Sequence, residues 1–212
     1  MSALARAASL FSLLALSAAC GSNAPKIPPE LLAGGGCVAP EYPSGPFGAE
    51  TGQVLANACF QGFRQPAQES HDPSSLETLA FSDYYDPTGS RGVKLILIDT
   101  AAIWCSACRT EHQTLSAKND QYSPLGLRIL GTLFQDAARN PATPDNLKTW
   151  VETFSSDYAM ALDPDYQMGS YAPAETAPLN LVVDARTMTI ELKLLGDQDS
   201  VLWPFIDAAL AQ

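Results

Sequence analysis

Basic side chains are scarce in this chain of 212 residues, which limits the partners it can have. Lysine and arginine number 12 against 23 aspartates and glutamates, so the net charge is −11. Nucleic-acid binding needs clustered positive charge, and no such cluster is visible, so no nucleic-acid partner is expected. Histidine is rarer still, with two residues, and only one Cys-x-x-Cys pair is present. A closed zinc site needs about four ligands, so no metal site of that kind is expected.

Long apolar runs are missing beyond the first nineteen residues. A membrane-spanning helix needs about 20 consecutive apolar residues, so none is expected in the rest of the chain. Residues 1–19 contain one charged side chain, Arg6, followed by an Ala, Ser, Leu and Phe run that ends in small residues. This pattern is typical of a secretory signal peptide, and it predicts that the protein is exported.

Cys20 follows the predicted signal peptide directly. Residues 16–21, Leu-Ser-Ala-Ala-Cys-Gly, resemble a bacterial lipoprotein box, although leucine lies one place further from the cysteine than usual. The chain has five cysteines, and lipidation of Cys20 would leave four that divide into two pairs. We therefore expect a periplasmic protein that is anchored to a bacterial membrane through lipid on Cys20. A cleaved signal peptide followed by an incidental cysteine is the alternative.

The remainder of the chain divides into three parts. Residues 20–36 are rich in Pro, Gly, Ala and Ser, which predicts a flexible tether. Residues 37–71 are rich in turn residues and predict an irregular N-terminal extension with one short strand. Cys37 and Cys59 are its expected structural disulfide, because conditions outside the cytoplasm favour oxidation. Residues 72–212 are expected to form the main domain.

Within residues 72–212, strand and helix patterns alternate. Nearly continuous apolar runs predict buried strands, and weaker patterns predict two further strands. The expected strands are 78–84, 93–98, 127–134, 158–162, 179–183 and 188–194, the last with the alternation of a half-exposed antiparallel strand. The expected helices are 105–122, 143–154 and 201–210. This order predicts an α/β fold in which a mixed central sheet is flanked by helices on both faces.

The strongest chemical signal is residues 104–108, Trp-Cys-Ser-Ala-Cys, between a buried strand and a helix. Disulfide exchange needs one thiolate that attacks and a second thiol that resolves the mixed disulfide. Unpaired N–H groups at a helix N-terminus favour a thiolate at the first position. The spacing therefore predicts that Cys105 is the exposed nucleophile and Cys108 the more buried resolving thiol. A purely structural disulfide is less favoured, because it would close almost no loop.

From about residue 79 to residue 212 the chain resembles the TlpA/ResA-type thioredoxin-like proteins. The resemblance is carried by the buried strand 95–98, by Trp104-Cys105-x-x-Cys108-x-x-Glu111, and by Ala177-Pro178 before the strand 179–184. It implies a thioredoxin-like fold for residues 72–212 and a protein disulfide oxidoreductase activity, more often that of a reductase. It further implies an extracytoplasmic, membrane-tethered protein. The partners would be thiol- or disulfide-containing proteins and a protein electron donor, and no cofactor is implied.

The resemblance also implies roles for single residues. Pro178 matches a cis-proline beside the disulfide, and it would turn the Ala177 backbone toward a substrate chain. Trp104 would pack over the site on the substrate side. Glu111 matches an acidic residue one turn after Cys108. If buried, its pKa would be raised and it would accept the Cys108 proton. A solvated glutamate near a helix N-terminus is an equally weighted alternative.

Two positions depart from the family pattern, because Ala107 stands where the family usually has proline and Gln113 where it often has proline. The change at Ala107 leaves the strength and direction of the redox reaction open. His112 is unusual beside Glu111, and we expect it at the surface. A copper carrier that uses Cys105, Cys108 and His112 is the alternative function, because sulfur and imidazole suit copper.

Overall fold

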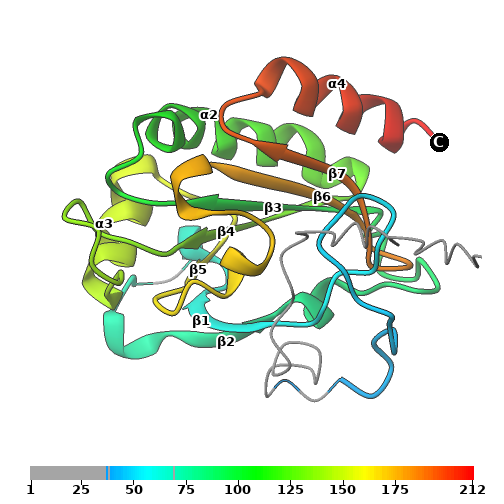
Figure 1. Ribbon diagram of the computed structural model, residues 1–212, viewed down its shortest axis with the longest axis horizontal. Helices are drawn as coiled ribbons and strands as arrows, with labels where there is room; N and C mark the ends of the chain where they lie inside the picture. The colour runs from blue at the N-terminus through cyan, green and yellow to red at the C-terminus, as the bar shows by residue number, and fades with distance from the viewer. Residues whose placement is uncertain (1–36, 38, 69) are drawn as a thin grey trace, which may run out of the picture.

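The computed structural model describes residue 37 and residues 39–68 and 70–212 (Figure 1). The predicted signal peptide, the tether and Cys20 lie outside these residues. The strands are β1 (Cys59–Phe63), β2 (Glu77–Ala80), β3 (Leu95–Ala101), β4 (Leu127–Leu133), β5 (Ala159–Leu162), β6 (Leu179–Asp184) and β7 (Thr189–Leu195). The α-helices are α2 (Ser106–Tyr122), α3 (Pro144–Phe154) and α4 (Asp199–Leu210). The predicted order from residue 93 onward is confirmed.

One predicted strand, 78–84, is only half correct. The chain leaves the sheet after Ala80 and forms a 3-10 helix over Phe81–Tyr84. The Asn57 side chain accepts the N–H of Ser82 at 3.0 Å, and the Asp83 carboxylate accepts the N–H of Ala80 at 3.0 Å. These two bonds use backbone donors that a longer strand would have offered to a neighbour.

The seven strands form one mixed sheet in the order β2-β1-β5-β4-β3-β6-β7. Strands β3, β4 and β5 are parallel to one another, and every other pairing is antiparallel. Strand β1 belongs to the residues that were predicted as a separate extension, yet it pairs with both β2 and β5. The sheet therefore begins before residue 72, and the short strand of the extension is one of its inner strands.

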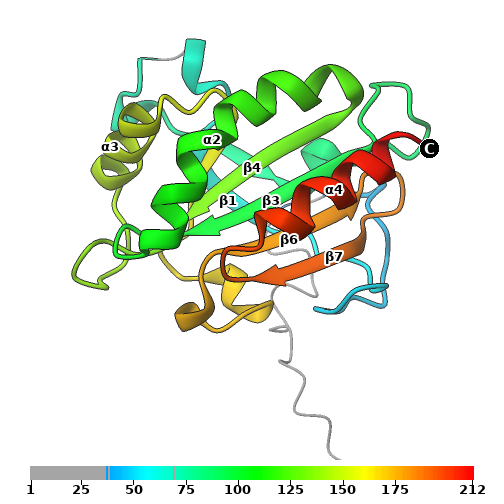
Figure 2. The same ribbon diagram turned by 90° about the horizontal axis from the view of Figure 1, so that it is seen from above.

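The three α-helices pack on the same face of the sheet (Figure 2). Alternate side chains of a strand point to opposite faces, and in β3 Leu95 and Leu97 face the helices while Ile96 and Ile98 face away. The crossovers from β3 through α2 to β4 and from β4 through α3 to β5 step across the sheet in one direction. Right-handed crossovers then place both helices on one side.

The second face carries no α-helix within the described residues. It is covered by the 3-10 helices Phe81–Tyr84 and Gln167–Ser170 and by part of the segment before β1, including Leu55. Helices were predicted on both faces of the sheet, and on this second face the described residues form only short 3-10 helices. The chain returns from β5 to β6 through residues 163–178, which form the 3-10 helices Gln167–Ser170 and Ala174–Thr176.

Candidate functional site

Cys105 and Cys108 form a disulfide at the start of α2, with their Cα atoms 5.3 Å apart. Cys105 is the N-cap of the helix, and its Sγ accepts the N–H of Cys108 at 3.0 Å. Cys105 retains 4% of its surface exposed, whereas Cys108 is fully buried. The sulfur that a partner reaches first is therefore the one at the helix N-terminus, where unpaired N–H groups stabilise a thiolate.

The loop before β6 packs against the hydrophobic cluster that contains the Cys105–Cys108 disulfide. The peptide bond between Ala177 and Pro178 is cis. Gly196, in the turn after β7, donates its N–H to the carbonyls of Thr176 and Pro178 at 2.9 and 2.8 Å. Ala177 packs against the hydrophobic cluster that contains both active-site cysteines. The structure thus brings the predicted substrate-binding loop to the same cluster as the disulfide, although 69 residues separate it from Cys108 along the chain.

Trp104 is held by the loop that follows β4. Its indole N–H donates to Gln135 at 2.9 Å, its ring meets the edge of Phe134, and the Arg139 guanidinium lies 3.9 Å from its ring centre. It is partly buried and packs against the cluster of the two cysteines. Gln135 and Arg139 were not among the predicted site residues, because nothing in their local pattern ties them to a residue more than 30 positions earlier.

Glu111 lies inside the protein, one helical turn beyond Cys108, with 4% of its surface exposed. Asn180 on β6 donates its amide to Glu111 Oε1 at 2.8 Å, while Oε2 has no partner. Burial, together with the nearby charge of Asp99, raises the pKa of Glu111 to about 9. Of the two expectations for Glu111, the structure shows the buried carboxyl group with a raised pKa and not the solvated one.

The expectation that His112 lies at the surface is wrong. Its side chain is buried, and its Nε2 lies 2.7 Å from Asp99 Oδ1. His112 is buried because it lies on the face of α2 that packs on the sheet beside β3 and against α3. Burial lowers the pKa of His112 to about 4, so the ring is neutral at neutral pH.

Asp99 is the functional candidate that the sequence reasoning missed. It lies on β3, six residues before Cys105, and it is fully buried. Burial raises the pKa of Asp99 to about 7. One signal was available, because a charged residue that continues a fully apolar strand is almost never buried without a reason.

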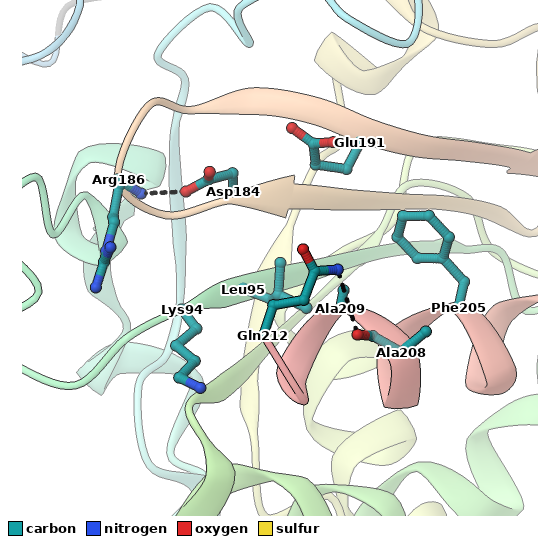
Figure 3. Close-up of a pocket in the computed structure, with 9 residues that line it drawn as sticks. All are labelled: Lys94, Leu95, Asp184, Arg186, Glu191, Phe205, Ala208, Ala209 and Gln212. Carbon is teal, nitrogen blue, oxygen red and sulfur yellow. Dashed lines mark hydrogen bonds between the residues drawn. The ribbon is translucent and has the colours of Figure 1, made fainter.

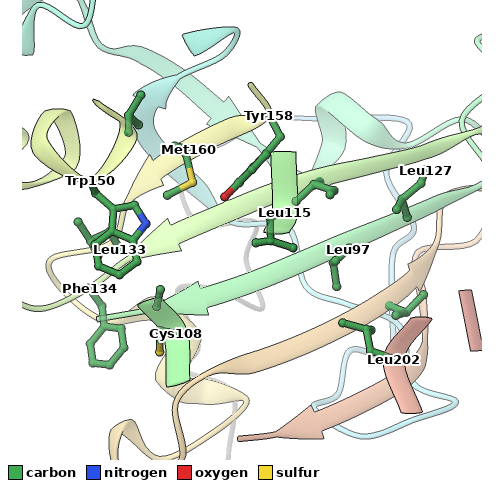
Figure 4. Packing of buried hydrophobic residues seen from close by; sticks show 14 of the residues in the cluster. Leu97, Cys108, Leu115, Leu127, Leu133, Phe134, Trp150, Tyr158, Met160 and Leu202 are labelled. Carbon is green, nitrogen blue, oxygen red and sulfur yellow. The ribbon is translucent and has the colours of Figure 1, made fainter. Parts of the chain in front are cut away.

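Trp150 and Tyr158 complete the surroundings of His112. The Trp150 indole N–H and the Tyr158 hydroxyl lie 3.1 and 2.8 Å from His112 Nδ1. Figure 4 shows both side chains in the layer of buried residues that also holds Leu115 and Cys108. Both ring nitrogens of His112 are thus already occupied. In the described part of the chain, no group of three or more Cys, His, Asp and Glu side chains is placed to hold a metal, so the copper-carrier alternative is not favoured.

A separate cavity of about 540 Å³ lies at the other end of β3 (Figure 3). It opens between α4 and the β6–β7 hairpin, and its charged lining is mixed in sign, with Lys94 and Arg186 beside Asp184 and Glu191. The Lys94 ammonium donates to the carbonyl of Leu210 at 3.0 Å. The lining of this cavity does not include either cysteine of the Cys105–Cys108 disulfide.

No family model matches the sequence, but single proteins are similar to it. The thiol:disulfide interchange protein DsbE of Escherichia coli K12 is 28% identical over 111 residues, which cover 52% of this chain and 54% of DsbE. The thiol:disulfide interchange protein HelX of Rhodobacter capsulatus is 28% identical over 147 residues, or 62% of this chain and 77% of HelX. The chain thus spans about half the length of the DsbE proteins that it matches.

Solved structures establish the fold. The thioredoxin domain of a thiol-disulfide oxidoreductase from Bacteroides vulgatus has a TM-score of 0.54 at 19% identity, covering 74% of this chain and 98% of that domain. A secreted thiol-disulfide isomerase from Corynebacterium glutamicum has a TM-score of 0.55 at 16% identity and covers 83% of this chain and 97% of its own. The predicted thioredoxin-like fold is confirmed, and the similar sequences support a thiol–disulfide oxidoreductase.

Proposed function

We propose that this protein is an exported thiol–disulfide oxidoreductase of the TlpA/ResA type that reduces disulfides in other proteins. The observation that carries the proposal is the Cys105–Cys108 disulfide at the start of α2, with its first sulfur at the helix N-terminus and a buried carboxyl group one turn below the second. The thiol:disulfide interchange proteins to which the chain is similar support the same activity.

The reaction starts from the reduced pair. The Cys105 thiolate attacks a substrate disulfide, a mixed disulfide forms, and the first substrate sulfur leaves as a thiolate. Cys108 then loses its proton and attacks Cys105 Sγ, which releases the second substrate sulfur and closes the Cys105–Cys108 disulfide. Two electrons pass from the protein to the substrate, and a protein electron donor restores the dithiol.

Three groups serve this reaction besides the cysteines. Glu111 receives the proton that Cys108 releases, because it lies one turn away in a site from which water is excluded. The Ala177 backbone before Pro178 pairs with the substrate chain, and Trp104 forms the adjoining wall. The Cys37–Cys59 disulfide lies apart from the chemistry and stabilises the segment before β1.

The proposed location is the periplasmic side of a bacterial membrane, with the lipid on Cys20. Among the helices of the described residues, none is both long and apolar enough to cross a bilayer. The sequence pattern at residues 16–21 supports the lipid anchor. Intact-mass measurement of the membrane-extracted protein would show a diacylglyceryl adduct that a Cys20→Ser variant lacks. An unmodified Cys20 in the wild-type protein would remove the anchor from the proposal.

The reduction potential of the pair tests the activity. The purified protein would be equilibrated in a dithiothreitol series, trapped with a thiol reagent and weighed by mass spectrometry. A potential near that of thioredoxin, about −270 mV, or lower supports a reductase, and a value near about −120 mV would make it an oxidant instead. With a mixed-disulfide-forming substrate, Cys108→Ser should accumulate the covalent complex and Cys105→Ser should form none. A pair that never cycles would rule out the activity.

A further inference from the structure

The hydrogen bonds around His112 determine which ring nitrogen carries its proton. The Trp150 indole N–H can only donate, and it lies 3.1 Å from Nδ1, so Nδ1 is an acceptor. The Tyr158 hydroxyl donates to the same nitrogen at 2.8 Å. In a neutral imidazole the other nitrogen then carries the proton, and Nε2–H donates to Asp99 Oδ1 at 2.7 Å. His112 therefore acts on Asp99 as a fixed, uncharged donor.

Asp99 and Glu111 are two buried carboxyl groups, and each one affects the pKa of the other. Two neighbouring carboxyl groups in a buried site favour the state in which one of them carries a proton. Asp99 Oδ1 is taken by His112 and Glu111 Oε1 by Asn180, whereas Asp99 Oδ2 and Glu111 Oε2 are buried without a donor from any other group. These two remaining oxygens are therefore the atoms at which the two carboxyl groups can bind a proton.

The other groups that face Asp99 and Glu111 have different effects on the ionisation of these two carboxyl groups. Asn180 on β6 donates to Glu111, and Tyr158 before β5 faces the pair through His112. Asp199 on α4 is a further charge near Asp99, and it disfavours ionisation there. Within the described residues, His112 is the side chain that donates to Asp99 Oδ1, and a donor to a carboxylate favours its ionised form.

We propose that His112 is a positioning residue that keeps Asp99 ionised while Glu111 holds the proton. The two carboxyl groups together can then bind the one proton that Cys108 releases. The proposal rests on the proposed function. As Cys108 attacks Cys105 Sγ, its proton moves to Glu111 and the Glu111 proton moves to Asp99 Oδ2. The charge of the pair changes from −1 to zero, the Cys105–Cys108 bond forms, and the substrate sulfur leaves with its electron pair.

Nitrogen chemical shifts in the unmodified protein provide the first test. The chain has two histidines, so ¹⁵N-histidine labelling gives two spin systems, and a His71→Asn variant assigns them. We expect His112 to show a protonated Nε2 and an unprotonated Nδ1 from pH 8 down to pH 6. A proton on Nδ1, or a charged ring at pH 7, would overturn the proposal. This measurement does not depend on the folding of any His112 variant.

Two variants test the consequence for the reaction. His112→Leu removes the donor, and His112→Gln places an amide donor near the position of Nε2. The readout is the pH profile of the step in which Cys108 resolves a preformed mixed disulfide, followed by rapid acid quench. In His112→Leu both carboxyl groups should be protonated at pH 7. The midpoint of the pH profile of the resolving step should therefore rise by about one pH unit, and the rate of that step at pH 7 should fall about tenfold. His112→Gln should recover most of the rate.

The outcomes separate this inference from the function on which it rests. If His112→Leu folds and keeps the wild-type pH profile, His112 does not control the pair and the inference is wrong. If the wild-type pair does not cycle at all, the proposed function fails, whatever the nitrogen shifts show. Carboxyl ¹³C titration of the oxidised protein adds a readout that is independent of turnover. At pH 7 it should show a clearly larger protonated fraction of Asp99 in His112→Leu than in the wild type, with Glu111 protonated in both.

Discussion

A buried asparagine lies near each of the two disulfides, and the two asparagines differ in how fully their side chains are hydrogen-bonded. Near Cys37–Cys59, the buried Asn57 is fully used, since its amide donates to the Cys37 carbonyl and to Ser82 Oγ and its oxygen accepts the N–H of Ser82. Near Cys105–Cys108, the buried Asn180 donates to Glu111 but its own oxygen has no partner.

The carboxyl groups beside the second disulfide extend this difference. Asp99 Oδ2 and Glu111 Oε2 are also buried without a donor, whereas Asp86, in the loop before β3, accepts the N–H groups of Arg91 and Val93. Buried polar groups are normally satisfied, and exceptions are costly. The first region is therefore built for stability. In the second region the proposed function would use the unpartnered oxygens to bind protons, and we expect them to lower the free energy of unfolding.

Removal of the first disulfide should have the largest effect on stability. The Cys37→Ser, Cys59→Ser double variant opens a link between residues 22 apart, which should lower the free energy of unfolding by about 3 kcal/mol. Disulfide reductase activity should stay within about twofold of wild type. Urea unfolding and an insulin-reduction assay measure the two effects. A loss of activity in a variant that is still folded would contradict the separation of the two regions.

Replacement of each asparagine by leucine compares the two regions directly. Asn57→Leu loses three hydrogen bonds and leaves the Ser82 N–H and the Cys37 carbonyl without their partner, so it should cost about 2 kcal/mol. Asn180→Leu loses one bond and leaves Glu111 Oε1 without its donor, but it also removes an oxygen that had no partner, so it should cost about 1 kcal/mol. The same urea titration measures both. Equal costs would show that the unpartnered oxygen has no energetic consequence.

The pH dependence of stability tests a single titrating group in the second region. In the oxidised protein the pKa of Glu111 is raised to about 9, so the folded state keeps a proton that the unfolded state has already lost near neutral pH. The free energy of unfolding should therefore fall as pH rises from 7 to 9, by up to about 1.4 kcal/mol per pH unit. His112, with its pKa lowered to about 4, acts in the opposite direction only below about pH 6.5.

Glu111→Gln should flatten this part of the pH profile, because it removes the titrating group and keeps its shape. Glu191→Gln, at an exposed position on β7, is the matched control and should leave the slope as it is in the wild type. Urea unfolding at pH 7, 8 and 9 gives the slope. A steep slope that survives in Glu111→Gln would assign the proton to another group.

The sequence by itself determined the order of strands and helices after residue 93, the α/β class and the cysteine pair at the start of α2, and its resemblance to TlpA/ResA-type proteins implied the thioredoxin-like fold. Apolar periodicity, helix start signals and a two-residue spacing are local patterns, so they are readable along the chain. Only the tertiary structure decided that β1 is an inner strand, that three α-helices share one face, and that His112 is buried.

The same holds for the polar cluster. Asp99, Trp150 and Tyr158 lie 13, 38 and 46 residues from His112, and β6 supplies Asn180 from 69 residues beyond Glu111. Whether a polar side chain is solvated or buried with a partner depends on which elements pack against it. That packing follows from the sheet order and the handedness of its crossovers, which no local pattern contains.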